Sequence, residues 1–472
     1  MSTAFIPLSA LQGSRRFEVL DPLVERALGS DRTLLLHPAS GKWVIVRDPT
    51  LGGVRALLAA CATGELDGAD ETEIWPLVTR LVESGLIKHR SAPSAGDSTC
   101  GKGGRQGVNT LILKMVGFCD LACRYCYDFR AETYSLRMSE ETAQRAISQA
   151  LGCAGPELRV LFHGGEPLLA FDLIRRLVPF AKAEADRAGR NVTFAVQSNG
   201  LHFSPEVIEF LLAEHFAIGI SIDGPREIND RDRVDHRGRG KLAEIEDTLR
   251  RNPRLRAVAG VLTTITSRNA DRLLETAEYV AELGIGRWET TLFQPLGRAA
   301  GRSAEFVPET SAVIGSYLAL FDAVEAGRFE HMAIGPVLRY VGNVLSDERR
   351  SMCLCDGCGA ASQLVTINVD GTIQACDSIG DASLNLGRLD SMTVNHALEL
   401  PVAERIRGRC TSVLSPCQTC DWRHFCGGTC LARGGLDTVD HQECEIALAI
   451  FPEIFRRLAI TNRLRRYVER FA

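Results

Sequence analysis

The stretch GFCDLACRYCYDF spans residues 117–129 and holds Cys119, Cys123 and Cys126 in a CxxxCxxC spacing. Clustered thiolates are typical ligands of zinc or of iron–sulfur clusters. A structural zinc site closes its coordination with four protein ligands, yet no fourth Cys or His follows closely behind Cys126. A cubane cluster held by three thiolates instead leaves one iron open to bind another molecule. On spacing alone, zinc, such a cluster and a chance run of cysteines all remain open.

The stretch follows the first of several strand candidates in a region where strands and helices alternate, from about residue 108 to residue 300. The strand candidates are LILKMV (111–116), LRVLF (158–162), VTFAV (192–196), AIGISI (217–222), VAGVLTTI (258–265) and WETTLF (288–293). Alternation of this kind predicts an α/β fold with parallel strands and crossover helices, either a doubly wound sheet or a complete or partial barrel.

Each polar motif of this region comes directly after a strand candidate: HGGEP after the second, QSNG after the third and SIDGP after the fourth. Because functional groups in such folds gather at the carboxyl ends of the strands, we expect the motifs to meet on one rim. The glycines allow backbone to approach a ligand closely, and Glu166 can accept from an ammonium group. The alternative for each motif alone is a tight turn with a helix cap.

Together these motifs resemble those of the radical SAM family over roughly residues 108–300. The resemblance implies a partial (β/α)6 TIM-like barrel in which the three cysteines hold a four-iron four-sulfur cluster, whose open iron binds the amino and carboxylate groups of S-adenosylmethionine. It also implies that Gly164, Gly165 and Glu166 contact the methionine amino group. The other cofactor-binding residues implied by the resemblance are Tyr125, Ser198, Asn199, Ser221, Asp223 and Arg233.

A second group of cysteines lies between Cys353 and Cys444 and resembles the SPASM extension. The resemblance implies two auxiliary four-iron four-sulfur clusters. One would be held by Cys417, Cys420, Cys426 and Cys444, and the other by Cys358, Cys376, Cys430 and a further cysteine. This further ligand is Cys353 or Cys355, and the sequence does not choose between them, although our set of ligands includes Cys355. A zinc ribbon fits the CxxC pair alone but not the full series.

Asp377 directly follows the cluster cysteine Cys376. In the sulfatase-maturating relatives that this region resembles, an acid at this place is the proposed proton acceptor from substrate. We therefore predict that Asp377 is the catalytic base, because a carboxylate near the reacting group can take up its proton. A surface or capping role is the alternative.

The sequence pattern of the first 90 residues predicts a small, separately folded unit. The runs TLLLH and KWVIV flank a Pro/Gly turn over residues 33–46, which predicts a hairpin. An apolar repeat of helical period follows in residues 74–82. The pattern resembles the PqqD-like recognition element, in which the leader of a precursor peptide adds as a strand to the sheet edge. The alternative is a winged-helix-like domain that only packs or dimerises.

The predicted organisation has six parts. They are a recognition domain (1–90), a Gly/Ser-rich linker (91–107), the radical SAM core barrel (108–300), a helical connector (301–350), the SPASM domain (351–446) and a C-terminal helix (447–472).

Charge and apolar patterns indicate which partners and which cellular compartment to expect. The net charge of −5 and pI near 6.1 give no electrostatic reason to expect nucleic acid. The N-terminus lacks a secretory signal pattern, and no apolar run is long enough to span a bilayer. We therefore expect a cytoplasmic protein without membrane partners. Thiols stay reduced in the cytoplasm. The 16 cysteines then indicate metal rather than disulfides.

These features lead to one functional hypothesis and two alternatives. We expect a radical SAM maturase that takes hydrogen from a ribosomally made precursor, bound through the N-terminal domain, and forms a thioether or carbon–carbon cross-link. Its cofactors would be S-adenosylmethionine and three four-iron four-sulfur clusters, with flavodoxin or ferredoxin as external reductant. The first alternative is a sulfatase-type maturase that oxidises Cys or Ser to formylglycine. The second, of another class, is a zinc-binding regulatory protein.

Overall fold

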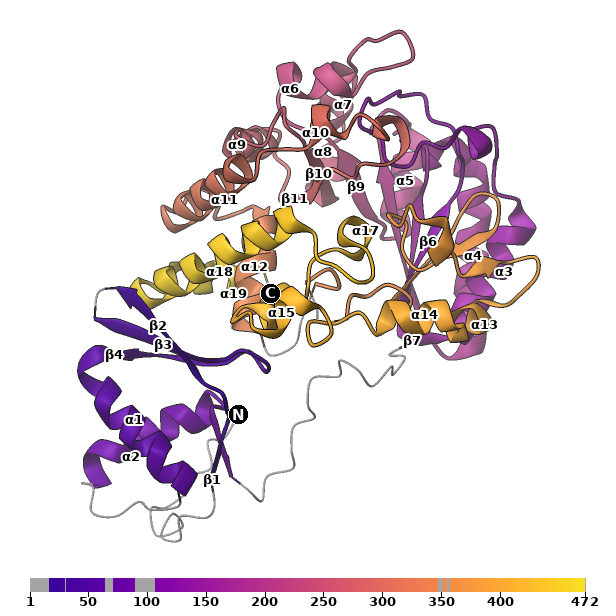
Figure 1. The fold of residues 1–472 in the computed structure, drawn as a ribbon. Coiled ribbons are helices and arrows are strands. Elements are labelled where there is room, and N and C mark those ends of the chain that lie inside the picture. Colours follow the sequence, from indigo (N-terminus) through magenta and orange to yellow (C-terminus); the bar gives the residue numbers. More distant parts are fainter. Residues whose placement is uncertain are drawn as a thin grey trace.

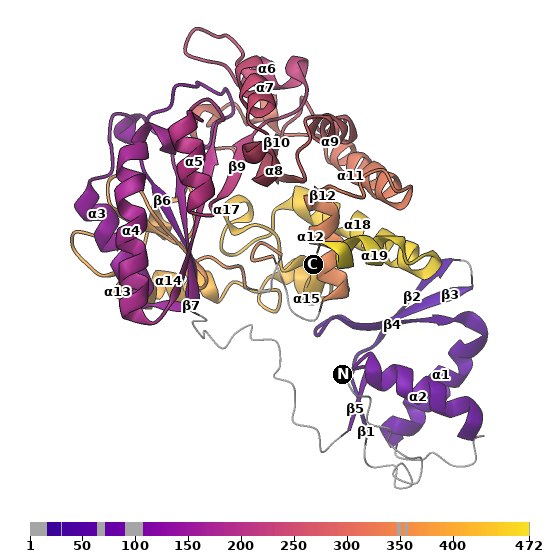
Figure 2. The same cartoon turned by 180° about the vertical axis from the view of Figure 1, so that it is seen from behind.

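The computed structural model describes residues 17–29, 31–63, 71–89, 107–346, 351–354 and 357–471. It shows an α/β core, a C-terminal part packed against that core, and an N-terminal unit that lies beside the C-terminal helices (Figures 1 and 2). The predicted linker and Cys355 lie outside the described residues. Within the ranges given, no helix has the length and apolar character needed to cross a membrane.

The core is a ten-stranded sheet in the order β12-β11-β10-β9-β8-β7-β6-β13-β14-β15. Every neighbouring pair from β12 to β13 is parallel. The parallel strands of the core are β6 (Val108–Lys114), β7 (Ala154–His163), β8 (Asn191–Ser198), β9 (Ala217–Ser221), β10 (Ala259–Ile265), β11 (Arg287–Leu292) and β12 (Ala333–Ile334). All six predicted strands are therefore confirmed, and the sheet is an open, partial barrel rather than a closed one.

Helices connect these strands and bury an apolar face against the sheet. Ser139 caps the first of them, because its hydroxyl accepts from the Thr142 amide at 3.0 Å. Figure 2 shows α3 and α4 side by side along the outer face. The helices of this part are α3 (Glu140–Gly152), α4 (Phe171–Ala188), α5 (Pro205–Ala213), α6 (Arg226–Asp232), α7 (Leu242–Arg251), α8 (Pro253–Val258), α9 (Leu273–Glu282), α10 (Ser303–Phe306), α11 (Thr310–Glu325) and α12 (Gly335–Leu345).

The C-terminal part adds its own strands to the core sheet. β13 (Leu364–Ile367) pairs in parallel with β6, and β14 (Thr372–Gln374) and β15 (Gly387–Arg388) follow antiparallel. The predicted SPASM region is thus continuous with the barrel. The remaining helices are α13 (Val394–Glu399), α14 (Pro401–Arg407), α15 (Ser415–Gln418), α16 (Arg423–Cys426), α17 (Leu431–Gly434), α18 (His441–Ile460) and α19 (Arg463–Arg470). The C-terminal helix expected from residue 447 begins at His441 and is split in two.

The N-terminal unit contains an antiparallel three-stranded sheet in the order β2-β3-β4. The predicted hairpin is formed by β3 (Arg32–His37) and β4 (Lys42–Arg47), and β2 (Val24–Gly29) adds a strand that the sequence pattern did not indicate. The other elements are β1 (Phe17–Val19), α1 (Asp48–Thr63), α2 (Glu71–Glu83) and β5 (Ile87–His89), with β1 paired to β5.

This small sheet is buried on both faces. Leu35 and Val44 point to the unit's own helices and share a core with Leu57 and Leu81. The intervening residues, among them Leu34 and Leu36, belong instead to the main core of the molecule. Side chains alternate between the two faces of a strand, so the apolar run TLLLH supplies both. The N-terminal unit is therefore packed onto the C-terminal part.

Trp43 of β4 lies at the centre of this packing. Its indole N–H donates to the Val344 carbonyl at 3.1 Å. Its ring meets the ring of Phe455 on α18 edge to face, with centroids 5.1 Å apart. Nearby, Arg26 forms an ion pair with Asp421. The contacts join the N-terminal sheet to the segment that carries the C-terminal cysteines.

Replacing Trp43 with alanine should loosen the N-terminal sheet from α18. Removing a large ring from a packed site leaves a cavity, and we expect the free energy of local opening to fall by about 2 kcal/mol since Trp43 is only partly buried. Native-state hydrogen exchange of β2–β4 measures this. Trp43→Phe keeps the ring contact but loses the indole hydrogen bond. Its free energy of local opening should therefore lie between those of the wild type and Trp43→Ala. Unchanged exchange in Trp43→Ala would contradict this packing.

Candidate active site

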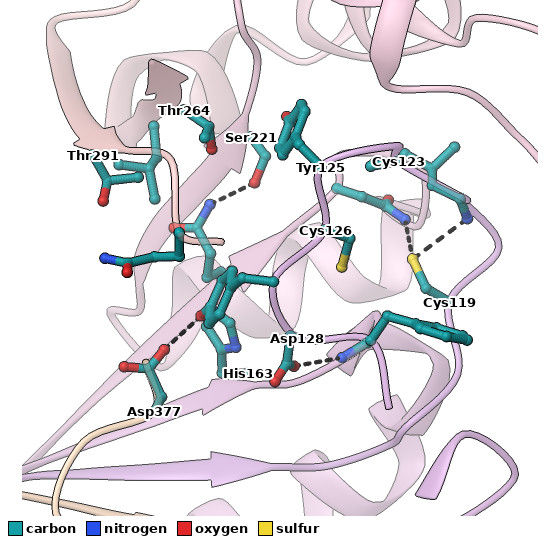
Figure 3. A pocket seen from close by; sticks show the side chains of 18 of the residues that line it. Cys119, Cys123, Tyr125, Cys126, Asp128, His163, Ser221, Thr264, Thr291 and Asp377 are labelled. Carbon is teal, nitrogen blue, oxygen red and sulfur yellow. Dashed lines mark hydrogen bonds between the residues drawn. The ribbon is translucent and has the colours of Figure 1, made fainter. Parts of the chain in front are cut away.

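A cavity of about 360 Å³ opens where the core strands end. Most of the predicted site residues line it, although they come from separate motifs and from the C-terminal part (Figure 3). The lining residues predicted from sequence are Cys119, Cys123, Tyr125, Cys126, Gly165, Ser198, Asn199, Ser221, Arg233 and Asp377. Gly164, Glu166 and Asp223 do not line the cavity; Glu166 and Asp223 are buried in the structure behind its wall.

Two glycines let the HGGEP turn pack against the cysteine loop. Gly165 has φ +48°, and a Cβ there would lie 2.0 Å from the Phe118 carbonyl oxygen. Gly164 has φ +82°, and its Cβ would meet Lys114 at 2.6 Å. The Glu166 amide donates to the same Phe118 carbonyl at 3.0 Å. Only glycine fits this close approach without strain, so the turn fixes the backbone just before Cys119.

Glu166 links the HGGEP turn to the QSNG motif. It is fully buried, and its carboxylate accepts from the Ser198 hydroxyl at 3.0 Å, the Asn199 amide at 2.7 Å and the Leu168 amide at 3.0 Å. Burial raises the pKa of Glu166 to about 7, while these donors act in the opposite direction. Both oxygens are thus engaged by the protein itself. Its predicted contact with a cofactor amino group stays a prediction.

Asn199 connects QSNG to the first cysteine. Its side-chain amide nitrogen, Nδ2, donates to the Asp120 carboxylate at 2.7 Å and lies 3.6 Å from the Cys119 sulfur. The three motifs HGGEP, QSNG and CxxxCxxC therefore form one hydrogen-bonded unit.

A second buried network holds Tyr125 in place. Its hydroxyl donates to the Asp223 carboxylate, and Arg233 donates to the Tyr125 oxygen at 2.9 Å. Burial raises the pKa of Asp223, and the Arg233 charge opposes that shift. Asp223 and Arg233 thus both hold the Tyr125 hydroxyl, and Tyr125 and Arg233 line the cavity.

The three thiols of the cysteine loop share the cavity with no further Cys among the residues that line it. Burial raises the pKa of Cys123, and it raises that of Cys126 to about 12. Bare thiols would therefore stay protonated, and binding of a metal would have to release their protons. In the described part of the chain, no three His, Cys, Asp or Glu side chains converge on a single ion. The donor set fits a three-thiolate cluster, whose ligands each bind a different iron.

Asp377 reaches the cavity from the loop after β14. The Tyr127 hydroxyl donates to its carboxylate at 2.5 Å, and Lys114, which is paired with Asp128, donates to its backbone oxygen at 3.3 Å. Burial favours the neutral acid, but the charges of His163 and Lys114 and the Tyr127 hydrogen bond keep the pKa of Asp377 below its usual value. Asp377 is therefore a carboxylate at neutral pH and can accept a proton.

Several lining residues were not predicted from the sequence. Tyr127 directly follows the CxxxCxxC run, whereas His163 and Gln197 are the first residues of the HGGEP and QSNG motifs. Gln197 donates to Ser221 at 2.9 Å. Arg298 stacks on Phe129, with 3.9 Å between the guanidinium carbon and the ring centroid. His163 and Gln197 could have been found by considering every residue of the two motifs, and Tyr127 by extending the cysteine run by one residue. Arg298 carries no such signal, because it lies in the GRAAG segment between β11 and β12, outside every motif.

The C-terminal thiols fall into two electrostatic neighbourhoods. Beyond the effect of burial, Cys358 raises the pKa of Cys353, Cys376 and Cys430. In the other neighbourhood, Cys444 raises the pKa of Cys426, and Cys420 raises that of Cys444. Cys417 packs beside Cys444 in a small apolar cluster. The two predicted ligand sets stay predictions, and Cys355 lies outside the described residues.

Fold and site together define an α/β enzyme with an open barrel and a three-thiol cavity at the carboxyl ends of its strands. The sequence profile of the Radical SAM superfamily matches residues 113–297, which are therefore a radical SAM domain. Enzymes of this superfamily bind S-adenosylmethionine and a four-iron four-sulfur cluster.

Two curated relatives match parts of the chain. An uncharacterized protein of Methanocaldococcus jannaschii is 31% identical over 192 residues, covering 40% of this chain and 64% of that protein. A cysteine-type anaerobic sulfatase-maturating enzyme of Clostridium novyi is 28% identical over 177 residues, covering 36% of this chain and 47% of that enzyme. The chain thus spans less than two thirds of the length of either relative.

Two solved structures share the fold. The structure of anSMEcpe with bound AdoMet has a TM-score of 0.66 and 20% identity, and the match covers 77% of this chain and 99% of that one. Streptococcus suis SuiB bound to the precursor peptide SuiA has a TM-score of 0.55 and 14% identity, covering 91% of this chain and 100% of that one. The second match includes more of the present chain.

Glu166→Gln should destabilise the site. The glutamine amide group would place a donor against the amides of Asn199 or Leu168, so at least one buried N–H would lose its acceptor. Such a loss costs about 2 kcal/mol. Thermal denaturation should show a lower Tm, and calorimetric titration weaker S-adenosylmethionine binding. Ser198→Ala is the comparison variant, because it removes the hydroxyl donor to Glu166 and the acceptor of the Gly200 amide but leaves the amides of Asn199 and Leu168 satisfied. Equal stability of Glu166→Gln and wild type would contradict the role given to this carboxylate.

Proposed function

We propose that the protein is a radical SAM peptide maturase that abstracts hydrogen from a ribosomally synthesised precursor and forms an intramolecular thioether or carbon–carbon cross-link. The observation that carries this proposal is the composition of one cavity. The three thiols of the core and the carboxylate of Asp377, from the C-terminal part, line the same space. One end offers a cluster site, and the other offers a base.

Each part of the cavity has a role in this proposal. Cys119, Cys123 and Cys126 hold the core cluster, and when bound the cluster and S-adenosylmethionine supply a 5′-deoxyadenosyl radical. Ser221 and Arg233 lie on the cavity wall where they can orient the cofactor. Asp377 accepts the proton that the substrate loses after the hydrogen atom has been removed. The cross-linked product then contains two hydrogens fewer than the precursor.

The N-terminal unit supports a peptide as the substrate. Its strand β4 is an edge of the sheet β2-β3-β4 among the described residues, and an open strand edge can receive an extended peptide by strand addition. The likeness to SuiB, a protein solved with its precursor peptide, extends over 91% of the chain and agrees with this assignment.

The second candidate is oxidation of Cys or Ser to formylglycine. The similarity to a sulfatase-maturating enzyme supports it, as does the fold of anSMEcpe. The additional N-terminal unit, docked through Trp43, favours the precursor maturase. A zinc-dependent regulatory protein is disfavoured because the radical SAM profile covers the cysteine loop.

We further propose that the C-terminal thiols hold two auxiliary clusters. Cys417, Cys420, Cys426 and Cys444 form one ligand set, and Cys358, Cys376 and Cys430 belong to the other. The electrostatic influence between Cys353 and both Cys358 and Cys430 supports Cys353 as its last ligand, while Cys355 lies outside the described residues. Two such clusters can pass on the second electron from the substrate. A cytoplasmic reductant such as flavodoxin or ferredoxin would supply the first electron to the core cluster.

The variant with all three core cysteines replaced by alanine should form no 5′-deoxyadenosine after anaerobic reconstitution. It should lose about four of the roughly twelve irons of the wild type, because only the core cluster is removed. Chromatography of the nucleoside and metal analysis measure both quantities. Continued cofactor cleavage by this variant would sink the assignment, and a colourless wild type with stoichiometric zinc would favour the regulatory alternative.

Asp377→Asn should separate cofactor cleavage from product formation. The amide cannot accept the substrate proton, so we expect 5′-deoxyadenosine to form while product falls by about two orders of magnitude. The assay is co-expression with a short reading frame beside the gene, followed by mass spectrometry for the loss of two hydrogens. An aldehyde-reactive hydrazide distinguishes a cross-link, which does not react, from formylglycine. Tyr127→Phe, which removes only the hydrogen bond to Asp377, should lose less product. Full product from Asp377→Asn would rule out this base.

A further inference from the structure

The edge of β4 opens into a second cavity, remote in sequence from the core motifs. Its floor is formed by Trp43, Val44 and Ile45. At the other edge of this sheet, the side chains of β2 form ion pairs, Arg26 with Asp421 and Glu25 with Arg55. Among the described strands of this sheet, β4 is therefore the edge with space beside it.

Two walls of different origin enclose this cavity, which we call the β4 groove. Helix α2 of the N-terminal unit supplies one wall with Arg80, Glu83 and Ser84. The end of α18 and the start of α19 supply the other, with Ile460 and Arg465 among the lining residues. The C-terminal helices, almost 400 residues further along the chain, thus complete a groove that the N-terminal unit cannot form alone.

The far wall has unused binding groups. Ile460 is 65% exposed although it is a large apolar side chain, so part of its surface is free to contact a ligand. Arg465 is half-buried, and within the described part of the chain it has no hydrogen-bond or ion-pair partner. Arg80 donates to the Ile45 carbonyl at 2.5 Å, so this carbonyl of β4 faces the groove, and a strand added to β4 would take the place of the Arg80 guanidinium there.

The charges of the groove are mainly positive. Arg32, Arg80 and Arg465 line it against a single acid, Glu83, although the whole chain has a net charge of −5. An extended strand added to β4 would direct alternate side chains to the two walls. One set would face α2, and the other would face Ile460 and Arg465.

We propose that the β4 groove binds an extended acidic segment of the precursor peptide, and that Arg465 and Ile460 of the C-terminal helices help to select it. This inference rests on the proposed maturase function and adds the chemistry of the recognised segment. Main-chain hydrogen bonds to β4 hold any extended peptide, while the arginines favour acidic side chains and Ile460 favours an apolar one between them.

The test compares two fluorescein-labelled synthetic peptides in which pairs of leucines alternate with pairs of either glutamates or lysines, so that each wall of the groove meets both an apolar and a charged side chain. Fluorescence anisotropy with the reconstituted full chain should show tighter binding of the glutamate peptide, weakening as salt is raised. Arg465→Glu should weaken this binding by roughly fivefold and should improve binding of the lysine peptide. Arg466→Glu is the matched control, because Arg466 is exposed next to Arg465 but does not line the groove.

The same preparations are assayed for 5′-deoxyadenosine formation without peptide, which both variants should retain. Loss of that activity in the wild type would count against the maturase function, whereas the anisotropy results concern the groove alone. Equal binding of the two peptides, no binding of the glutamate peptide, or equal effects of Arg465→Glu and Arg466→Glu would overturn the inference. Ile460→Asn, expected to weaken the leucine-containing glutamate peptide without reversing its charge preference, tests the apolar part separately.

Discussion

The parallel alignment of β6 to β13 is the constraint on which the site depends. All these strands run in one direction, so the loops that follow β6, β7, β8 and β9 emerge at the same edge of the sheet. Residues 79 positions apart thereby come within hydrogen-bond distance, as Asn199 and Asp120 do. Because β13 pairs with β6 in the same direction, the C-terminal part of the chain lies next to the loop that follows β6. Asp377 can then meet Tyr127 across 250 residues of sequence.

The sheet of the N-terminal unit imposes a second constraint. Since one of its faces packs on its own helices and the other on the main core, the unit is held in a fixed place beside the C-terminal part (Figure 1). The hairpin turn reaches His424, whose ring lies 3.1 Å from the Ala39 carbonyl oxygen, between Cys420 and Cys426. The N-terminal sheet that carries the β4 groove and the segment that carries Cys420 and Cys426 thus share one packed interface. Removing the whole unit would uncover Phe455 and its neighbours, so point variants report on recognition more cleanly than deletion.

The sequence predicts most of the core but not the connections between distant parts. The six long strands carry strong apolar runs, and their motifs follow directly, so their existence and common edge could be predicted. Which motif side chain faces the cavity could not be predicted. Glu166 and Ser198 are both polar residues at the end of a strand, but only Ser198 lines the cavity. Strands β13 to β15 are two to four residues long. β13 pairs with the distant strand β6, and β14 and β15 add to β13 in turn, which local sequence patterns do not indicate. The groove wall at Arg465 is likewise a product of tertiary packing.

The shape of the main cavity suits chemistry that must avoid water and unwanted hydrogen donors. Its lining includes the apolar side chains of Ile112, Leu161 and Leu262, which would keep solvent away from a reactive carbon centre. The hydroxyls of Tyr125 and Tyr127 donate to Asp223 and Asp377, so neither O–H group points freely into the space. The same hydrogen bonds that position the two tyrosines therefore also remove them as competing donors, and a substrate side chain would be the nearest available source of hydrogen.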